Sequence, residues 1–242
     1  MDEHSIHSPF FFDFYVNVIK ASKQHEGHEP VEEIRTSLLE NETAITIEDL
    51  GAGSRSHRGH TTIAQVAKAS LSSTRLSNLY EHICNYNDSK YIVELGTSMG
   101  INTLYLANNN NKKVFTFEGS QAFIDIALTH FELFDKQNIK LIEGNIDKTL
   151  PQFLQATEKI NFALIDANHR YEPTIRYFNQ LARRLNEKSI VVVDDIHWSE
   201  EMEMAWKELH KHELVYGSID LYRCGILFFD PALNKQHFIL SL

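Results

Sequence analysis

The stretch YIVELGTSMG, residues 91–100, decides the fold of this chain. An apolar run that contains Glu94 leads into a turn with two glycines, Gly96 and Gly100, and a helical pattern opens at Ile101. A buried strand, a tight turn and a helix start are the parts of a nucleotide-binding edge in an α/β sheet. Both glycines permit positive φ and let a ligand approach the backbone closely. The same pattern also occurs as plain α/β packing, so neighbouring segments have to separate the two interpretations.

Four more apolar runs follow, and each ends in a polar or acidic residue. They are residues 114–118, 139–145, 160–166 and 189–194. Glu118 comes about 20 residues after Gly96, where an acid can accept both ribose hydroxyls of an adenosine. Ligands of open α/β sheets bind at the carboxyl ends of the strands, so these strand ends are predicted to share one ligand site.

The last two apolar runs, residues 214–221 and 224–229, are separated by only a short turn. Strands this close in sequence form an antiparallel hairpin rather than a parallel crossover. We therefore predict an α/β fold: a Rossmann-like, seven-stranded, mostly parallel sheet with an antiparallel strand in its terminal hairpin, plus an N-terminal helical extension. The expected division is residues 1–86, a cap, substrate or dimer region, and residues 87–242, the ligand-binding domain.

The N-terminal region has three parts with different patterns. Residues 9–20 form a short, strongly apolar helix that is too short to span a bilayer, so it should pack on the domain or on a second subunit as a homodimer. Residues 21–45 are charged and are expected to include a surface loop. Residues 49–60 predict a basic loop, with a substrate-contacting lid as the alternative. Residues 61–86 predict one or two amphipathic helices.

Composition limits the classes of partner. A net charge of −10 over 242 residues argues against non-specific binding of nucleic acid, which needs a basic surface. No apolar run approaches the roughly 18 residues of a membrane span, and the first residues lack a signal peptide's basic segment. Cys84 and Cys224 have no metal or redox spacing, so both are expected to be reduced thiols. We expect a cytoplasmic protein with a small-molecule partner and no membrane contact.

The glycine turn, with its preceding acid, resembles motif I of the class I S-adenosylmethionine (SAM) methyltransferases. This resemblance implies that Glu94 lies near the amino group of the methionine part, and that Glu118 binds the ribose. The region of residues 139–145 corresponds to the place where related enzymes hold the adenine ring. The implied cofactor-binding residues are Glu94, Gly96, Thr97, Ser98, Gly100, Glu118, Gly119, Asn145, Ile146 and Asp166.

Three carboxylates are predicted to meet where two neighbouring strands end. Asp166 closes one strand, and Asp194 and Asp195 follow the next. Carboxylates brought together repel each other unless a cation neutralises them, and an all-oxygen set suits a hard ion such as Mg²⁺. The alternative is that Asp194 and Asp195 end a strand and cap the helix that starts near Ser199.

The two clusters, residues 166–169 and 194–198, resemble the paired motifs of metal-dependent O-methyltransferases. These include the catechol and caffeoyl-CoA branch and the macrocin and novobiocin-type sugar branch. The resemblance implies that Asp166, Asp194 and Asp195 bind the metal. His169 stands where the catecholic branch has its catalytic Lys, so we predict His169 as the general base, with Asp166 beside it in the catalytic set.

Two features of these motifs stay open. Asn168 departs from the sugar branch, which has an acid there, because Asn cannot take up a proton. His169 could also be an ordinary hydrogen-bonded histidine in a chain that has 13 of them. Trp198 and Trp206 are interpreted as packing residues.

The predicted function is SAM-dependent O-methylation of a hydroxyl on a small molecule or sugar-like acceptor, with assistance from Mg²⁺ or another divalent cation. The alternatives are a metal-independent methyltransferase for another acceptor atom, a non-catalytic SAM-binding module, and an NAD(P)-dependent oxidoreductase. The absence of G-x-G-x-x-G and the terminal hairpin argue against the oxidoreductase.

Overall fold

The computed structural model describes residues 7–47 and 61–242, and the predicted loop at 49–60 lies outside them. One eight-stranded sheet forms the centre, in the spatial order β10-β8-β9-β7-β6-β3-β4-β5. A second, two-stranded sheet pairs β1 (Ala44–Ile45) with β2 (Thr61–Thr62). The strands of the large sheet are β3 (Tyr91–Leu95), β4 (Lys113–Glu118), β5 (Ile139–Glu143), β6 (Phe162–Ile165), β7 (Ile190–Asp194), β8 (Gly217–Asp220), β9 (Cys224–Phe228) and β10 (Gln236–Ile239).

Strands β3 to β9 are the seven predicted strands, and their directions agree with the prediction. All neighbouring pairs among β3, β4, β5, β6 and β7 are parallel, whereas β9 runs antiparallel to both β7 and β8. The sheet has one strand more than predicted, because β10 pairs in parallel with β8 and forms the edge of the sheet. The four residues of β10 alternate between half-buried and exposed, which is too short a pattern to identify as a strand from sequence.

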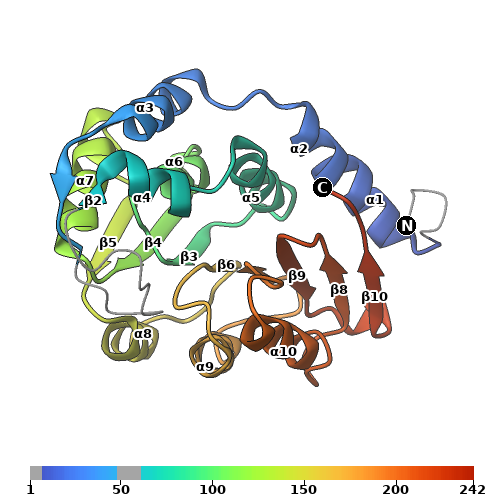
Figure 1. The fold of residues 1–242 in the computed structure, drawn as a ribbon. Coiled ribbons are helices and arrows are strands. Elements are labelled where there is room, and N and C mark those ends of the chain that lie inside the picture. Colours follow the sequence, from blue (N-terminus) through green and yellow to red (C-terminus); the bar gives the residue numbers. More distant parts are fainter. Residues whose placement is uncertain (1–6, 48–60) are drawn as a thin grey trace.

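Helices cover both faces of the large sheet (Figure 1). On one face lie α1 (Pro9–Phe14), the π-helical segment η2 (Tyr15–Lys20), α2 (Ala21–Gln24), α5 (Thr74–Tyr86), α6 (Ile101–Leu106) and α7 (Gln121–Leu133). On the other lie α8 (Ile146–Gln155), α9 (Tyr171–Ala182) and α10 (Glu200–Leu209). A short 3₁₀ turn, η3 (Pro231–Leu233), precedes β10. No helix in these described ranges is long and apolar enough to cross a membrane.

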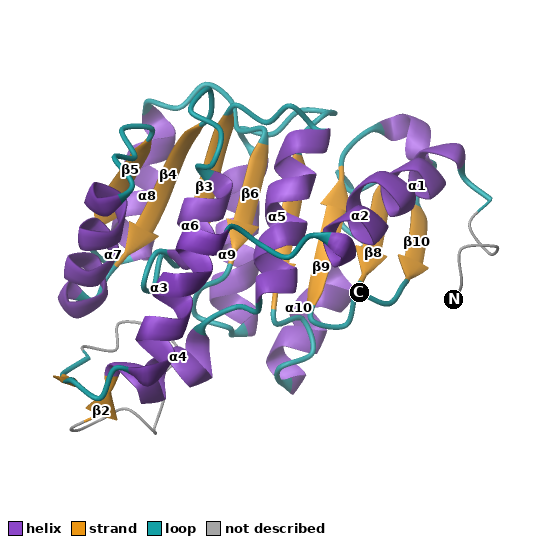
Figure 2. Cartoon of the chain, turned by 90° about the horizontal axis from the view of Figure 1, so that it is seen from above, coloured by secondary structure: helices purple, strands orange, loops and turns teal. Residues whose placement is uncertain are grey.

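Helices α3 (Glu29–Glu40) and α4 (Ile63–Ser70) lie on the side of the molecule toward which the arrowheads of β4 and β6 point (Figure 2). Helix α3 falls in the segment 21–45, which was expected to be charged and to include a surface loop. Two of its charged residues are paired: Arg35 donates to Glu32 at 2.9 Å and to the carbonyl of Ser72, and Tyr105 donates to Glu32 at 2.6 Å. This pairing lets a helix with little apolar character pack on α6 and α4.

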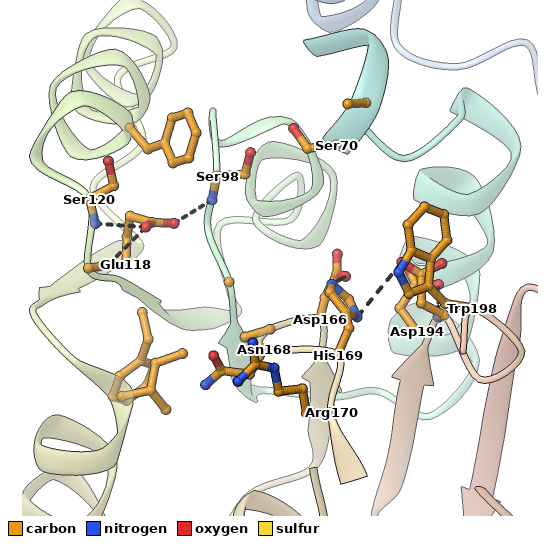
Figure 3. A pocket seen from close by; sticks show the side chains of 18 of the residues that line it. Ser70, Ser98, Glu118, Ser120, Asp166, Asn168, His169, Arg170, Asp194 and Trp198 are labelled. Atoms are coloured by element: carbon orange, nitrogen blue, oxygen red, sulfur yellow. Dashed lines mark hydrogen bonds and ion pairs between the residues drawn. The ribbon is translucent and has the colours of Figure 1, made fainter. Parts of the chain in front are cut away.

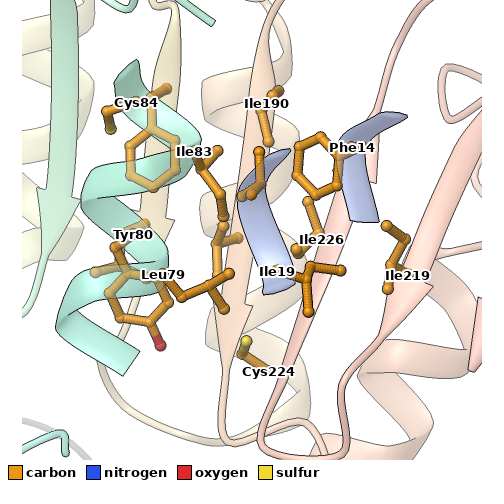
Figure 4. Close-up of a cluster of buried hydrophobic side chains, with 14 of the residues drawn as sticks. Phe14, Ile19, Leu79, Tyr80, Ile83, Cys84, Ile190, Ile219, Cys224 and Ile226 are labelled. Carbon is orange, nitrogen blue, oxygen red and sulfur yellow. The ribbon is translucent and has the colours of Figure 1, made fainter. Parts of the chain in front are cut away.

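The N-terminal helix packs on the sheet, and it extends four residues beyond the predicted end at Lys20. Phe11 and Phe14 are fully buried, and both rings make edge contacts with Phe228 of β9. Phe14 belongs to a buried cluster that joins this helix to α5, β7, β8 and β9 (Figure 4). By contrast Phe12 is 46% exposed. The apolar run therefore contributes to the core of the domain, while one of its aromatic residues faces outward.

Candidate functional site

A cavity of about 670 Å³ lies at the carboxyl ends of β3, β4, β6 and β7. Its walls come from the turn after β3, the end of β4 and the segments that follow β5, β6 and β7, and residues of α4 close one side. Figure 3 shows side chains from these elements around the cavity. The strand ends that were predicted to share one ligand site thus surround one cavity.

The glycine turn after β3 allows a backbone contact that no other residue would permit. Gly96 has φ +101°, and a Cβ there would lie 2.1 Å from the carbonyl oxygen of Asp166. Gly100 has φ +83° and is packed against Phe131 of α7. The turn therefore touches β6 on one side and α7 on the other, so Gly96 sits directly beside the end of the neighbouring strand.

Glu118, at the end of β4, has its carboxylate held by backbone donors. The N–H of Ser98 donates to Oε2 at 2.8 Å, and the N–H groups of Gly119 and Ser120 donate to Oε1 at 2.9 Å each (Figure 3). Burial raises the pKa of Glu118, and these three N–H groups act in the opposite direction. The result is a fixed carboxylate in the cavity wall with lone-pair capacity remaining on Oε2.

Glu94 is fully buried and is not among the residues that line the cavity. Its Oε2 accepts hydrogen bonds from Thr103 at 2.5 Å and Thr116 at 2.6 Å, while Oε1 has no partner. Burial raises the pKa of Glu94 to about 7. Thr97 is also buried, with its hydroxyl 2.6 Å from that of Thr116. Glu94, Thr97 and Gly100 are therefore predicted cofactor residues that do not line the cavity.

The remaining predicted cofactor residues line the cavity. They are Gly96, Ser98, Glu118, Gly119, Asn145, Ile146 and Asp166. Asn145 also starts α8, because its side chain accepts the N–H of Asp147 at 2.8 Å. Seven of the ten predicted cofactor residues therefore lie in the cavity wall. Glu94, inside β3, and Thr97 and Gly100, in the turn, do not.

The three predicted metal ligands also lie in the cavity wall. Burial, and then the neighbouring carboxylates, raise the pKa of Asp166 to about 8 and that of Asp194 to about 8. Asp194 is 1% exposed and accepts the N–H of Asp195 at 2.8 Å. Ser199, not an aspartate, caps α10 by accepting the N–H of Met202 at 3.2 Å. The capping alternative for Asp194 and Asp195 is therefore wrong.

His169 lies between two of these carboxylates. Its Nε2 is 3.6 Å from Oδ1 of Asp166, and its Nδ1 is 3.7 Å from Oδ2 of Asp195. Ligand atoms of Asp166, His169 and Asp195 all lie within 4.8 Å of one another, which is close enough to hold one metal ion. Two carboxylates and one imidazole are ligands that divalent ions accept. This set differs from the predicted one, since His169 takes the place of Asp194.

Comparison with protein families identifies the domain that carries this cavity. Residues 93–196 match the family described as "Methyltransferase domain". The chain contains a methyltransferase domain. The matched segment runs from inside β3 to just after β7, and so includes both the glycine turn and the acidic cluster. The predictions of an enzyme and of a class I methyltransferase are confirmed, and the oxidoreductase alternative is wrong.

Solved structures share the methyltransferase fold at low sequence identity. An O-methyltransferase from Bacillus cereus in complex with SAH aligns at a TM-score of 0.65 with 16% identity, over 86% of this chain and 94% of that one. The O-methyltransferase TomG from Streptomyces achromogenes, in complex with SAM, aligns at 0.60 with 16% identity, over 86% and 100%. The SAH-bound Podospora anserina methyltransferase PaMTH1 aligns at 0.59 with 14% identity, over 84% and 96%. Comparison with curated protein sequences gave no match.

Two residues of the methyltransferase cavity were missed or misread from sequence. Arg223, on the turn between β8 and β9, places Nε 3.0 Å from Oδ1 of Asp195 and 3.7 Å from Oδ1 of Asp194. Trp198 is 69% exposed in the cavity wall, so its interpretation as a packing residue is wrong, whereas Trp206 is buried as expected. The only sequence signal for Arg223 is a basic residue at a hairpin turn, which is common on solvated turns.

Proposed function

We propose that this methyltransferase transfers a methyl group from SAM to a hydroxyl oxygen of a small-molecule acceptor. The observation that carries the proposal is the position of Glu118, a fixed carboxylate that shares one cavity with Asp166, Asp194 and Asp195. One side of the cavity then suits a nucleoside, and the other suits a group that has to lose a proton. Structural neighbours solved with SAM or SAH support the choice of cofactor.

On the cofactor side, Glu118 is assigned to the ribose. Its Oε2 accepts one N–H and can accept a further hydrogen bond from a ribose hydroxyl. Asn145 and Ile146 are assigned to the adenine region, because both line the wall beyond Glu118. Asp166 is assigned to the cationic methionine end, since it lines the cavity beside Gly96 whereas Glu94 lies behind the wall.

On the acceptor side, the reaction needs an oxygen nucleophile aligned with the methyl group and relieved of its proton. A divalent ion held by Asp166, His169 and Asp195 would lower the proton affinity of an acceptor hydroxyl. Asp194 would then help to position Asp195, because its carboxylate accepts the N–H of that residue. Trp198 would give the acceptor an exposed aromatic wall.

A metal-independent route is the second candidate, and one observation favours it. The ion pair between Arg223 and Asp195 already compensates one charge of the cluster. In that case His169, with both ring nitrogens near carboxylates, accepts the proton of the hydroxyl as the general base. The two roles of His169 exclude each other at one nitrogen, because a lone pair that binds a metal cannot take up a proton.

The test has a binding stage and a transfer stage. Calorimetry should show that SAH binds the full chain. Failure to bind would contradict the proposal that SAM is the methyl donor. Radiolabelled SAM should then be incubated with a panel of phenols, catechols and sugars, with Mg²⁺ or with EDTA. Under the metal-assisted route EDTA abolishes transfer but leaves SAH affinity unchanged. Under the metal-independent route EDTA has no effect, and His169→Ala lowers the rate by roughly 10²–10⁴-fold.

A further inference from the structure

The side chain of Arg223 brings a positive charge to the acidic cluster of Asp166, Asp194 and Asp195. Arg223 contacts Asp195 through Nε at 3.0 Å, a normal distance for a charge-assisted hydrogen bond. Asp195 is the central carboxylate of the cluster: its Oδ1 faces Arg223, and its Oδ2 is 3.7 Å from His169. Arg223 therefore pairs with Asp195, which is one of the three residues that could hold a metal ion.

The two partners differ in how freely they can move. The side chain of Asp195 is 13% exposed, and the backbone before it is fixed by β7, whose last residue is Asp194. The side chain of Arg223 is 47% exposed and lies on a short turn between two strands. The carboxylate is thus held in place, while the arginine can swing into solvent without disturbing the core.

We propose that Arg223 is the built-in cation of this cluster and that its charge opposes the binding of a divalent ion by Asp166, His169 and Asp195. The proposal rests on the assignment of this cluster to the acceptor side of the methyltransferase. The physical reason is that a second cation near Asp195 is repelled by the first and shares the same carboxylate. Arg223 therefore sets the metal affinity of the site, and a metal ion binds tightly only when this side chain has moved away.

The consequence is a site whose metal dependence is adjustable by one side chain. With Arg223 against Asp195, the cluster has partial charge compensation and can stay assembled without a metal ion. Without that charge, His169 is the remaining ion-pair partner of Asp195 among the described residues, and Asp194 has none there. A cation from solution then becomes the main way to reduce their repulsion.

The experiment measures Mn²⁺ binding to the full chain by calorimetry and by the electron paramagnetic resonance signal of free Mn²⁺. Arg223→Gln removes the charge, Arg223→Met is a second neutral variant of similar length, and Arg223→Lys keeps the charge. Arg176→Gln is the matched control, because Arg176 pairs with Asp147 and Glu172 and does not line the cavity. SAH binding by each variant serves as the test of folding.

We expect Arg223→Gln and Arg223→Met to bind Mn²⁺ roughly tenfold more tightly than the unchanged chain, the size of effect that one removed charge gives at a partly buried site. Arg223→Lys and Arg176→Gln should resemble the unchanged chain. Adding Asp195→Asn to Arg223→Gln should abolish the gain. Equal or weaker Mn²⁺ binding in both neutral variants, or no binding in any variant, would overturn the inference. SAH binding retained in that case would leave the methyltransferase proposal intact.

Discussion

The two sides of the cavity hold their carboxylates in opposite ways. On the β4 side the carboxylate of Glu118 accepts three backbone N–H groups, and burial is the main cause that raises its pKa. On the β6 and β7 side Asp166, Asp194 and Asp195 lie close together, and Asp194 accepts only the N–H of Asp195 from the backbone. Burial acts on both sides, and on the second side the neighbouring carboxylates also raise the pKa values of Asp166 and Asp194.

This difference indicates what each side is suited to bind. A carboxylate that backbone donors already stabilise keeps its geometry whether or not a ligand is present, which suits recognition of a neutral hydroxyl pair. Carboxylates that repel one another gain most from a ligand that brings positive charge. Arg223 supplies such a charge from within the chain, and SAM, as a sulfonium with an amino group, or a metal ion could supply it from outside.

The largest effect is expected where the two sides meet, at Gly96. Gly96→Ala places a methyl group 2.1 Å from the carbonyl oxygen of Asp166 and adds the strain of φ +101°. We expect a loss of about 3–5 kcal/mol in the free energy of unfolding, measured by urea denaturation. Gly144→Ala is the control, since φ is +115° but the nearest atom would be 3.4 Å away, and it should cost only about 1–2 kcal/mol. Equal losses would show that the contact between the two sides is unimportant.

The next effect concerns pH and the buried carboxylate behind the turn. The pKa of Glu94 is raised to about 7, above its usual value of 4.5. Between pH 4.5 and 7 the unfolded chain loses this proton while the folded chain keeps it, so stability falls as pH rises and levels off above pH 7. Glu94→Gln removes this penalty. Relative to the unchanged chain, the variant should gain about 2–3 kcal/mol between pH 5 and pH 8.

The measurement for Glu94→Gln is urea denaturation at the two pH values. The matched control is Glu143→Gln, because Glu143 is the last residue of β5 in the same sheet but is exposed. It should leave the pH dependence unchanged. A Glu94→Gln variant with the same pH dependence as the unchanged chain would mean that Glu94 stays ionised in the folded protein.

A smaller and more local effect is expected at Glu118. Glu118→Ala should weaken SAH binding by about 1.5–3 kcal/mol, the range for hydrogen bonds to a charged group. Calorimetry measures it directly, and Glu143→Ala, outside the cavity, should bind SAH normally. Unchanged affinity in Glu118→Ala would remove the assignment of the β4 side to the ribose.

The smallest effect on stability is expected at Trp198. Because its side chain is 69% exposed, Trp198→Ala should change the free energy of unfolding by no more than about 0.5 kcal/mol. The same change at Trp206, which is 3% exposed and donates to Asp220 at 3.0 Å, should cost about 3–5 kcal/mol. Trp198→Ala should instead raise KM for an acceptor while leaving SAH affinity unchanged. A large loss of stability would return Trp198 to the role of a packing residue.

Much of the fold could be read from the chain because its determinants are local. Apolar runs of strand length, each followed by a helical pattern, predicted β3, β4, β5, β6 and β7, and the short turn before residue 224 predicted the antiparallel β9. Strand β10 and helix α3 were missed because their determinants are not local. Each is held by partners distant in sequence, β8 for the strand and the Arg35 and Tyr105 contacts for the helix.

The sequence by itself determined which residues reach the edge of the sheet, since a strand end, a glycine turn and an acid are all encoded within a few neighbouring positions. Only the tertiary structure decided which of them face the cavity. Glu94 lies behind the wall because Thr103 and Thr116 enclose it, and Arg223 reaches Asp195 because β9 is inserted between β7 and β8. Contacts across strands depend on the order and twist of the sheet, which no local pattern of residues specifies.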